Sequence, residues 1–175
     1  MFWTNSAYGE IVRASMDGTS SYPNVMGQRT PRSIVVDYEY SRLYWVDYYK
    51  DLIESSDFNG KEVYTVRSIC SPGWGIDLSG DRGLYWGTYG SIGDIHRCNL
   101  TRSCEEEEFV YSPSTSVLGL KLRHSSRQPI QGTDARLNPC ASAPCSHFCV
   151  LNPNSFTCLC PKGMAIIGDG RTYRK

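Results

Sequence analysis

A short aromatic motif recurs along the chain and limits its fold more than any other feature. The motif reads FWTN at 2–5, YWVD at 44–47 and YWGT at 85–88, so its copies begin 42 and 41 residues apart. A period of about 40 residues is typical of repeat architectures, in which each repeat forms one supersecondary unit. The sequence therefore predicts a chain of similar units rather than one irregular core.

Each motif lies in the same order of features, with an apolar strand ending near Asp, a turn, and then the aromatic strand. This order is clearest at 33–47 and 75–88, and alternating segments follow each motif. Two of those segments contain the dipeptides Asp17-Gly18 and Asn59-Gly60, which favour tight hairpin turns because they tolerate positive φ. Four short strands in about 40 residues are the signature of a β-propeller blade.

These motifs resemble the YWTD repeat, also called the LDL-receptor class B repeat, over residues 1–129. The segment VLGLKLRHSSRQP at 117–129 resembles the terminal propeller strand that leads into an EGF-like module in this family. The resemblance implies an all-β fold: part of a six-bladed propeller, about three blades, followed by that module. Asn5 and Thr88 replace the Asp of the motif, and the first blade is expected to lack its inner strand.

The sequence also predicts that the chain is a fragment. The first ten residues, MFWTNSAYGE, have neither the basic nor the apolar region of a signal peptide. The chain has no apolar run near the ~18 residues that cross a bilayer. A membrane connection is therefore expected only through regions outside this chain.

Cysteines are concentrated near the end of the chain. Five of the eight lie at 140–160 in the order C-x4-C-x3-C-x8-C-x-C, which favours a small disulfide-stapled module in an oxidising, extracellular compartment. Residues 138–175 resemble an EGF-like domain, with 130–137 as a linker. The resemblance implies bonds between Cys140 and Cys149 and between Cys145 and Cys158. Cys160 is left without the disulfide partner that the family has, because Tyr173 stands where the family has the sixth cysteine.

The remaining cysteines lie in the repeats. Cys98 and Cys104 flank five residues, short enough for a local disulfide, while Cys70 and Cys160 stay unassigned because connectivity does not follow from sequence alone. Asn99 begins the chain's N-x-S/T sequon, Asn-Leu-Thr, and is a candidate glycosylation site in a secreted protein.

The motif residues themselves are predicted to be structural. Trp3, Trp45 and Trp86 hold the same place in successive repeats, so we expect them in the core between blades, with Asp47 as the motif's carboxylate. The other interpretation, an aromatic row that binds ligand, is disfavoured because one large buried aromatic per repeat explains the pattern.

Metal and cofactor sites are not expected. A zinc site using cysteines and His147 is disfavoured because no C-x2-C pair occurs. Calcium in the EGF-like module is possible through Asn152 and Phe156 but is disfavoured, because the acidic pair before Cys140 is absent and the ion needs several oxygen ligands. No cofactor is predicted.

Catalysis and nucleic-acid binding are also not expected. The chain contains no G-x-S-x-G or H-E-x-x-H, so it is predicted not to be an enzyme and to have no small-molecule substrate. Its 18 basic and 18 acidic residues balance, which gives no electrostatic case for nucleic acid.

The resemblance implies an extracellular module of a lipoprotein-receptor-related protein that binds protein ligands, with roles in endocytosis or signalling. The alternatives are a secreted, nidogen-like matrix or adhesion connector and a truncated product without function. Acid-triggered ligand release occurs in this family, and histidine titrates near endosomal pH. The sequence does not assign that role to His96 or His124.

Overall fold

The structure is a computed structural model, and it describes residues 1–123, 139–152, 155–159, 161, 163–168 and 173–174. The chain divides into two compact units. One consists mainly of Phe2–Arg13 and Pro23–Pro129, and the other mainly of Ile130–Lys175. The predicted linker, 130–137, lies outside the described residues.

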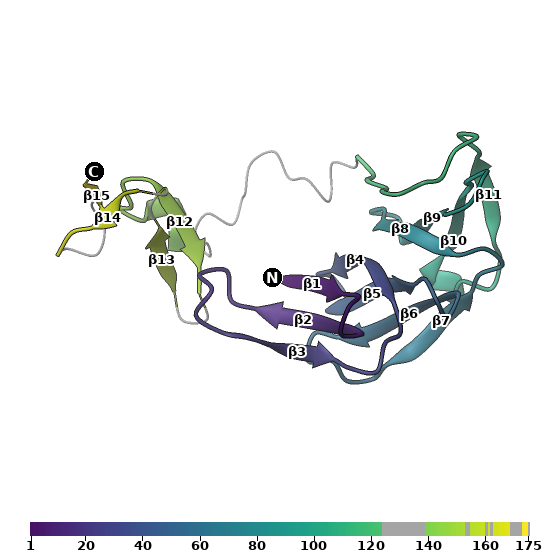
Figure 1. The fold of residues 1–175 in the computed structure, drawn as a ribbon, viewed down its shortest axis with the longest axis horizontal. Helices are drawn as coiled ribbons and strands as arrows, with labels where there is room; N and C mark the ends of the chain where they lie inside the picture. Colours follow the sequence, from purple (N-terminus) through teal and green to yellow (C-terminus); the bar gives the residue numbers. More distant parts are fainter. Residues whose placement is uncertain (124–138, 153–154, 160, 162, 169–172, 175) are drawn as a thin grey trace. The chain divides into compact units, whose positions relative to one another are not determined.

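The first unit contains three antiparallel sheets, which are three propeller blades (Figure 1). The first blade has strands β1 (Phe2–Asn5), β2 (Glu10–Ala14) and β3 (Ser21–Val25). The second has β4 (Pro31–Asp37), β5 (Arg42–Asp47), β6 (Leu52–Asp57) and β7 (Tyr64–Ser68). The third has β8 (Gly73–Leu78), β9 (Gly83–Thr88), β10 (Ile95–Asn99) and β11 (Glu108–Tyr111), with a short 3-10 helix, η1 (Leu100–Arg102), after β10.

Equivalent strands pair in the same register in different blades. Ile34 of β4 lies opposite Trp45 of β5, and Ile76 of β8 lies opposite Trp86 of β9. The two predicted hairpins form, with Gly18 at φ +76° and Gly60 at φ +73°. A side chain at Gly60 would also collide with the backbone, because a Cβ there would lie 1.7 Å from the Asn24 carbonyl oxygen. The 41-to-42-residue repeat of the sequence is thus a repeat of blades.

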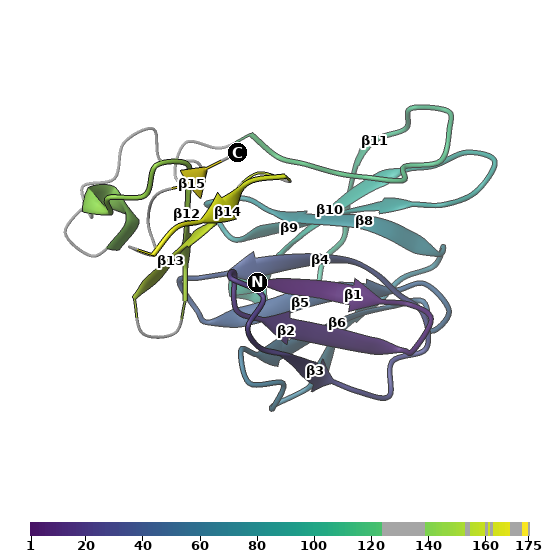
Figure 2. The same cartoon turned by 60° about the vertical axis from the view of Figure 1, so that its left-hand side comes forward.

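The apolar core lies between neighbouring blades. Trp45 packs with Leu43, Ile11 and Val25 between the first and second blades. Trp86 belongs to the larger cluster between the second and third, whose other members include Ile53 and Ile76. Strand β4 contacts both β1 and β8, and Figure 2 shows it between them. The blades therefore follow one another in sequence order.

Trp3 corrects one prediction. It is 37% exposed, whereas Trp45 and Trp86 are 0% and 1% exposed. The reason is its strand: β1 is the edge of a three-stranded sheet, while β5 and β9 each have a neighbour on both sides. The prediction that the first blade has no inner strand agrees with this sheet.

The predicted terminal strand is also corrected over the residues that the structure describes. Residues 117–123 form no strand. Their N–H groups bond to the end of the third blade, from Val117 to the Thr88 carbonyl at 3.0 Å and from Leu122 to the Asp77 carboxylate at 2.8 Å. Isolated bonds of this kind do not make a ladder, which needs a parallel or antiparallel strand edge. Residues 124–129 lie outside the described residues.

The second unit contains two small hairpins. Strand β12 (Phe148–Leu151) pairs with β13 (Phe156–Leu159), and β14 (Ala165–Ile166) pairs with β15 (Tyr173–Arg174), after the 3-10 helix η2 (Pro139–Ser142). Disulfides join Cys140 to Cys149 and Cys145 to Cys158, the pairing that the EGF-like resemblance implies. Cys160 lies outside the described residues. No helix in the described parts of the chain is long and apolar enough to cross a membrane.

Candidate protein-binding surface

In the second and third blades, the inner strand begins and the motif strand ends at the same rim. Because these strands are antiparallel, Pro31 lies opposite Asp47 and Gly73 lies opposite Thr88. The next residue in each motif strand is Tyr48 or Tyr89, and its N–H donates to the loop before the inner strand, at 2.9 Å to Thr30 and 2.7 Å to Pro72. The second and third blades thus each present one aromatic residue at the same rim, whereas the first has Ser6 at this position.

The aromatic–arginine cluster consists of Tyr48, Trp74, Tyr89 and Arg32. The Trp74 ring lies 5.1 Å from Tyr89 and 5.6 Å from Tyr48, and the two tyrosine rings lie 5.9 Å apart. The Arg32 guanidinium lies 4.3 Å from the Trp74 ring centre and 5.5 Å from that of Tyr48. Tyr89 is exposed and the other three residues are half-buried. The cluster joins the second and third blades and offers rigid rings to solvent.

A second cation–aromatic pair extends this rim. The Arg29 guanidinium lies 3.8 Å from the centre of the Tyr49 ring, and both residues are exposed. An exposed pair of this kind contributes roughly 0.5–1 kcal/mol. Because the stacked guanidinium still has free N–H groups, the pair can also contact a ligand.

The positive charge at the rim is not neutralised locally. Among the described residues, no carboxylate lies within ion-pair distance of Arg29 or Arg32. Within the same residues, the buried Nε of Arg32 has no hydrogen-bond acceptor. Lys50 differs, since its ammonium lies 3.3 Å from Glu54. The rim therefore suits a partner that brings carboxylates and apolar surface together.

Asp47 holds this rim in place. Its carboxylate is fully buried and accepts four backbone N–H groups, those of Arg29 at 2.7 Å, Thr30 at 3.0 Å, Tyr49 at 3.1 Å and Lys50 at 3.2 Å. These donors come from the loop before β4 and from the turn after β5. Asp47 thus fixes the backbone that carries Arg29 and Tyr49, which gives the motif's carboxylate a structural role.

Thr88 takes over part of this role in the third blade. Its hydroxyl accepts the Asp94 N–H at 2.8 Å, and its own N–H donates to the Asp94 carbonyl at 2.9 Å. A hydroxyl closes this turn but binds fewer donors than a carboxylate. In the first blade, Asn5 instead donates to Glu10 at 3.0 Å.

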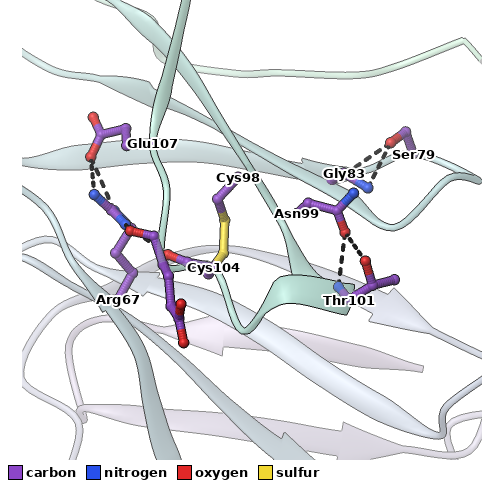
Figure 3. Close-up of a disulfide and its surroundings, with 9 residues drawn as sticks. Arg67, Ser79, Gly83, Cys98, Asn99, Thr101, Cys104 and Glu107 are labelled. Carbon is purple, nitrogen blue, oxygen red and sulfur yellow. Dashed lines mark hydrogen bonds and ion pairs between the residues drawn. A yellow bond between two sulfur atoms is a disulfide. The ribbon is translucent and has the colours of Figure 1, made fainter.

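A disulfide-tied loop joins the third blade to the second (Figure 3). Cys98 is bonded to Cys104, and both are buried in the core between these blades. Arg67 of β7 donates to the Cys104 carbonyl at 2.7 Å and pairs with Glu107 at 2.7 Å. Glu107 also contacts the His96 Nδ1 at 2.7 Å. The loop is therefore held by an ion pair to the second blade as well as by its disulfide.

The sequon lies inside this loop. The Asn99 amide oxygen accepts the Thr101 N–H at 2.8 Å and the Thr101 hydroxyl at 2.7 Å, and Figure 3 shows both bonds. These bonds use the oxygen of the amide and leave its nitrogen out of the turn. Asn99 is only partly buried.

The predicted residues do not form one site. Trp45, Trp86 and Asp47 are buried structural residues, and Cys70 is a free, exposed cysteine. In the EGF-like unit, the Asn152 amide bonds to Ser155 and Thr157. Among the described residues, no group of three His, Cys, Asp or Glu side chains is arranged to hold a metal.

The sequence patterns did not predict the aromatic–arginine cluster. A signal was present, because Tyr48 and Tyr89 follow the fourth residue of their motifs and Trp74 stands two residues before the Ile that faces the motif Trp. The motif residues themselves belong to the core between the blades. The neighbours just outside the motif are the ones that reach the rim.

Comparison with known proteins supports the two-part organisation. The EGF-like domain model matches residues 140–172. The vitellogenin receptor Yl of Drosophila melanogaster is 28% identical over 98% of this chain, and the vitellogenin receptor of Solenopsis invicta is 30% identical over 98%. Low-density lipoprotein receptor-related protein 4 of Rattus norvegicus is 31% identical over 79%.

The resemblance to the LDL-receptor-related family is confirmed. The chain spans 8%, 9% and 7% of the lengths of those three relatives. A solved structure entitled "Crystal structure of Nidogen/Laminin Complex" matches 68% of this chain and 46% of its own, with a TM-score of 0.62 and 19% identity. At that identity the match supports the propeller fold alone.

These matches support an extracellular receptor module built from a YWTD propeller and an EGF-like domain. The homologues are receptors and do not come from enzyme families. The prediction that the chain itself is not an enzyme remains a prediction.

Proposed function

We propose that this chain is a ligand-binding module of an extracellular lipoprotein-type receptor, and that the aromatic–arginine cluster is the centre of its binding surface. The observation that carries the proposal is the position of Tyr48, Trp74 and Tyr89 around Arg32 at one rim of two adjacent blades. Aromatic and arginine side chains are the residues most often responsible for binding energy at protein interfaces. Arg29 and Arg32 add charge for acidic groups of the ligand.

Vitellogenin is the first ligand to test, because two relatives that align with nearly the whole chain are vitellogenin receptors. We further propose that the whole receptor takes up the bound ligand by endocytosis. The nidogen-like alternative has less support, since its match is a fold match at 19% identity.

The test measures binding of purified Solenopsis invicta vitellogenin to the immobilised chain by surface plasmon resonance. Trp74→Ala removes the central ring and should weaken binding at least about thirtyfold, the range of an interface hot spot. Arg29→Glu changes an exposed residue and should also weaken binding, with a smaller risk to the fold.

Tyr38→Ala is the matched control. Tyr38 is 79% exposed and follows β4, at the opposite end of the blade from the cluster. Its removal should leave binding unchanged. Absence of vitellogenin binding by the unmodified chain would refute the ligand class, and equal losses in Trp74→Ala and Tyr38→Ala would refute the assignment of the surface.

A further inference from the structure

A cavity lies between the second and third blades, at the end of the blades opposite to the aromatic–arginine cluster. Tyr40 and Arg82 stand in the turns before the motif strands β5 and β9, whereas Tyr48 and Tyr89 of the cluster follow those strands. The cavity has a volume of about 360 Å³, within the range of small-ligand sites, about 300–1,000 Å³. Its lining includes residues of both blades: Tyr40, Arg42, Tyr44, Tyr64, Arg82 and Leu100.

Two stacked pairs of a guanidinium and a tyrosine ring line this cavity. The Arg82 guanidinium lies 3.7 Å from the centre of the Tyr40 ring. The Arg42 guanidinium lies 4.7 Å from the centre of the Tyr64 ring. Stacking uses the face of a guanidinium and leaves the N–H groups at its edge available for hydrogen bonds. Because Tyr40 is 54% exposed and Tyr64 is 48% exposed, a ligand in the cavity can reach both rings.

The two arginines are paired with carboxylates that differ in exposure. Arg82 pairs with Asp37, which is buried. Arg42 pairs with Glu62 at 3.2 Å, and the Glu62 side chain is 74% exposed. An exposed ion pair contributes little free energy, so an incoming anion can take the place of Glu62 on Arg42. Two arginines and Asp37 then remain, with a net charge of +1.

The cavity also has hydrogen-bond donors that lack an acceptor. Within the part of the chain that the structure describes, the buried Nε of Arg82 has no hydrogen-bond partner. A buried donor without an acceptor is costly and calls for an explanation such as a missing ligand. Burial raises the pKa of the Tyr44 hydroxyl above its usual 10.0, against a hydrogen bond from Arg82 that lowers it. Tyr44 therefore stays protonated and is a further donor for a ligand oxygen.

We propose that this cavity binds an aryl sulfate, with Arg42 and Arg82 bound to the sulfate oxygens and Tyr40 and Tyr64 packed against the aromatic ring. A sulfate monoester carries one negative charge, which matches the net charge left when Glu62 is displaced. A phosphate monoester carries about 1.5 to 2 negative charges, more than the site neutralises. A carboxylate has two oxygens in one plane and matches a single guanidinium, whereas the tetrahedral sulfate group directs oxygens towards both arginines.

The first test is an NMR titration of the 175-residue chain with phenyl sulfate. The backbone amide signals of Thr65 and Ser103, which line the cavity, should shift and give the dissociation constant. Phenol lacks the charge and inorganic sulfate lacks the ring, so both should bind more weakly than phenyl sulfate, and phenyl phosphate should do so as well. No binding of phenyl sulfate, or equal binding of phenol or inorganic sulfate, would overturn the site. Equal or tighter binding of phenyl phosphate would overturn the choice of sulfate.

The second test uses a substitution that should strengthen binding, a result that damage to the fold would not produce. Glu62→Gln removes the competing carboxylate and should lower the dissociation constant of phenyl sulfate about two- to fivefold, the range of an exposed ion pair. Glu108→Gln is the matched control, because Glu108 also forms an exposed ion pair, with Arg97, away from the cavity. Unchanged or weaker binding by Glu62→Gln, or an equal gain in Glu108→Gln, would contradict the proposal.

The third test removes one of the two guanidinium groups. Arg42→Gln should weaken binding of phenyl sulfate at least about tenfold, because a hydrogen bond to a charged group is lost. Arg97→Gln is its control, since Arg97 is likewise a partly buried arginine in ion pairs but does not line the cavity. Equal losses in the two variants would refute the role of Arg42.

A final comparison identifies the source of the aryl sulfate. The same titration is run with a short peptide that carries one sulfotyrosine and with the same peptide unsulfated. Binding of the sulfated peptide more tightly than phenyl sulfate assigns the group to a partner protein, and weaker or equal binding assigns it to a free aryl sulfate. Equal binding of the sulfated and unsulfated peptides would overturn the proposal. Loss of vitellogenin binding in Trp74→Ala is a separate result, because Trp74 lies at the other end of the blades.

Discussion

Replacing Asp47 by alanine should destabilise the propeller unit more than any other change to a single polar side chain of the second blade. The carboxylate is fully buried and accepts N–H groups from Arg29, Thr30, Tyr49 and Lys50. Removing it leaves these donors without their acceptor and detaches the loop before β4 from the turn after β5. Arg29 and Tyr49 of the rim then lose their fixed backbone.

The size of the effect follows from the bonds. A hydrogen bond to a charged group contributes about 1.5–3 kcal/mol net, and a simple sum over the four bonds would exceed the ~4–5 kcal/mol above which single substitutions are exceptional. Arg29 and Tyr49 are exposed, so water replaces part of the loss. We expect Asp47→Ala to lower the free energy of unfolding by about 3–4 kcal/mol. Asp47→Asn should cost less, because one oxygen keeps the donors of Thr30 and Tyr49.

The assay is equilibrium unfolding in guanidinium chloride at a single protein concentration, since association would make stability depend on concentration. Tryptophan fluorescence reports it because Trp45 and Trp86 are buried. Hydrogen exchange should show lost protection at the N–H groups of Thr30 and Tyr49. Asp57→Ala is the matched control: Asp57 accepts Asn59 and Lys61 N–H groups in a half-exposed turn, and its loss should cost about 1 kcal/mol. Equal costs for Asp47→Ala and Asp57→Ala would refute the reasoning.

Three further predictions concern the loops. Replacing both Cys98 and Cys104 by alanine removes a disulfide with a sequence separation of 6 and should lower the free energy of unfolding by roughly 2 kcal/mol in the loop-entropy model. The same unfolding curves measure this change, and an unchanged free energy relative to Cys70→Ala would contradict it. When the chain is secreted from eukaryotic cells, we expect a glycan on Asn99, because its amide nitrogen is left out of the Asx turn; a PNGase F-sensitive gel shift should vanish in Asn99→Gln and persist in Asn59→Gln. The pKa of Asp17 is lowered from 3.8 to about 2, first by the Thr19 backbone N–H and then by the Ser15 and Thr19 hydroxyls. A depressed folded-state pKa means that this carboxylate stabilises the hairpin above about pH 4 and that the contribution is lost as the pH falls through 2; an NMR titration midpoint near 4 would disprove it.

The blades could be predicted because their information is local. Strand, turn and motif strand lie within 15 residues at 33–47, and the alternation of side chains along a strand decides which of them face the core. The same locality explains why Trp45 and Trp86 are buried as predicted and why a disulfide between Cys98 and Cys104 could be proposed from their spacing. The pairing in the EGF-like unit came from resemblance, because spacing alone leaves several connectivities open.

The candidate surface could not be predicted in this way. Arg32, Tyr48, Trp74 and Tyr89 each look like ordinary loop or strand-end residues in the sequence. They meet only because two blades present the same rim side by side, so residues up to 42 positions apart, Arg32 and Trp74, contact one another. The clamp between Arg67 and Glu107, separated by 40 residues, arises in the same manner.

Trp3 shows the difference between what the local sequence determines and what the sheet topology determines. The sequence alone determined that FWTN is a blade motif, since a repeat is visible from its own residues. Burial of its tryptophan depended on a neighbouring strand, and neighbours are decided by sheet topology. β1 lies at an open edge, so the same motif that forms a core in two blades leaves an exposed aromatic in the first.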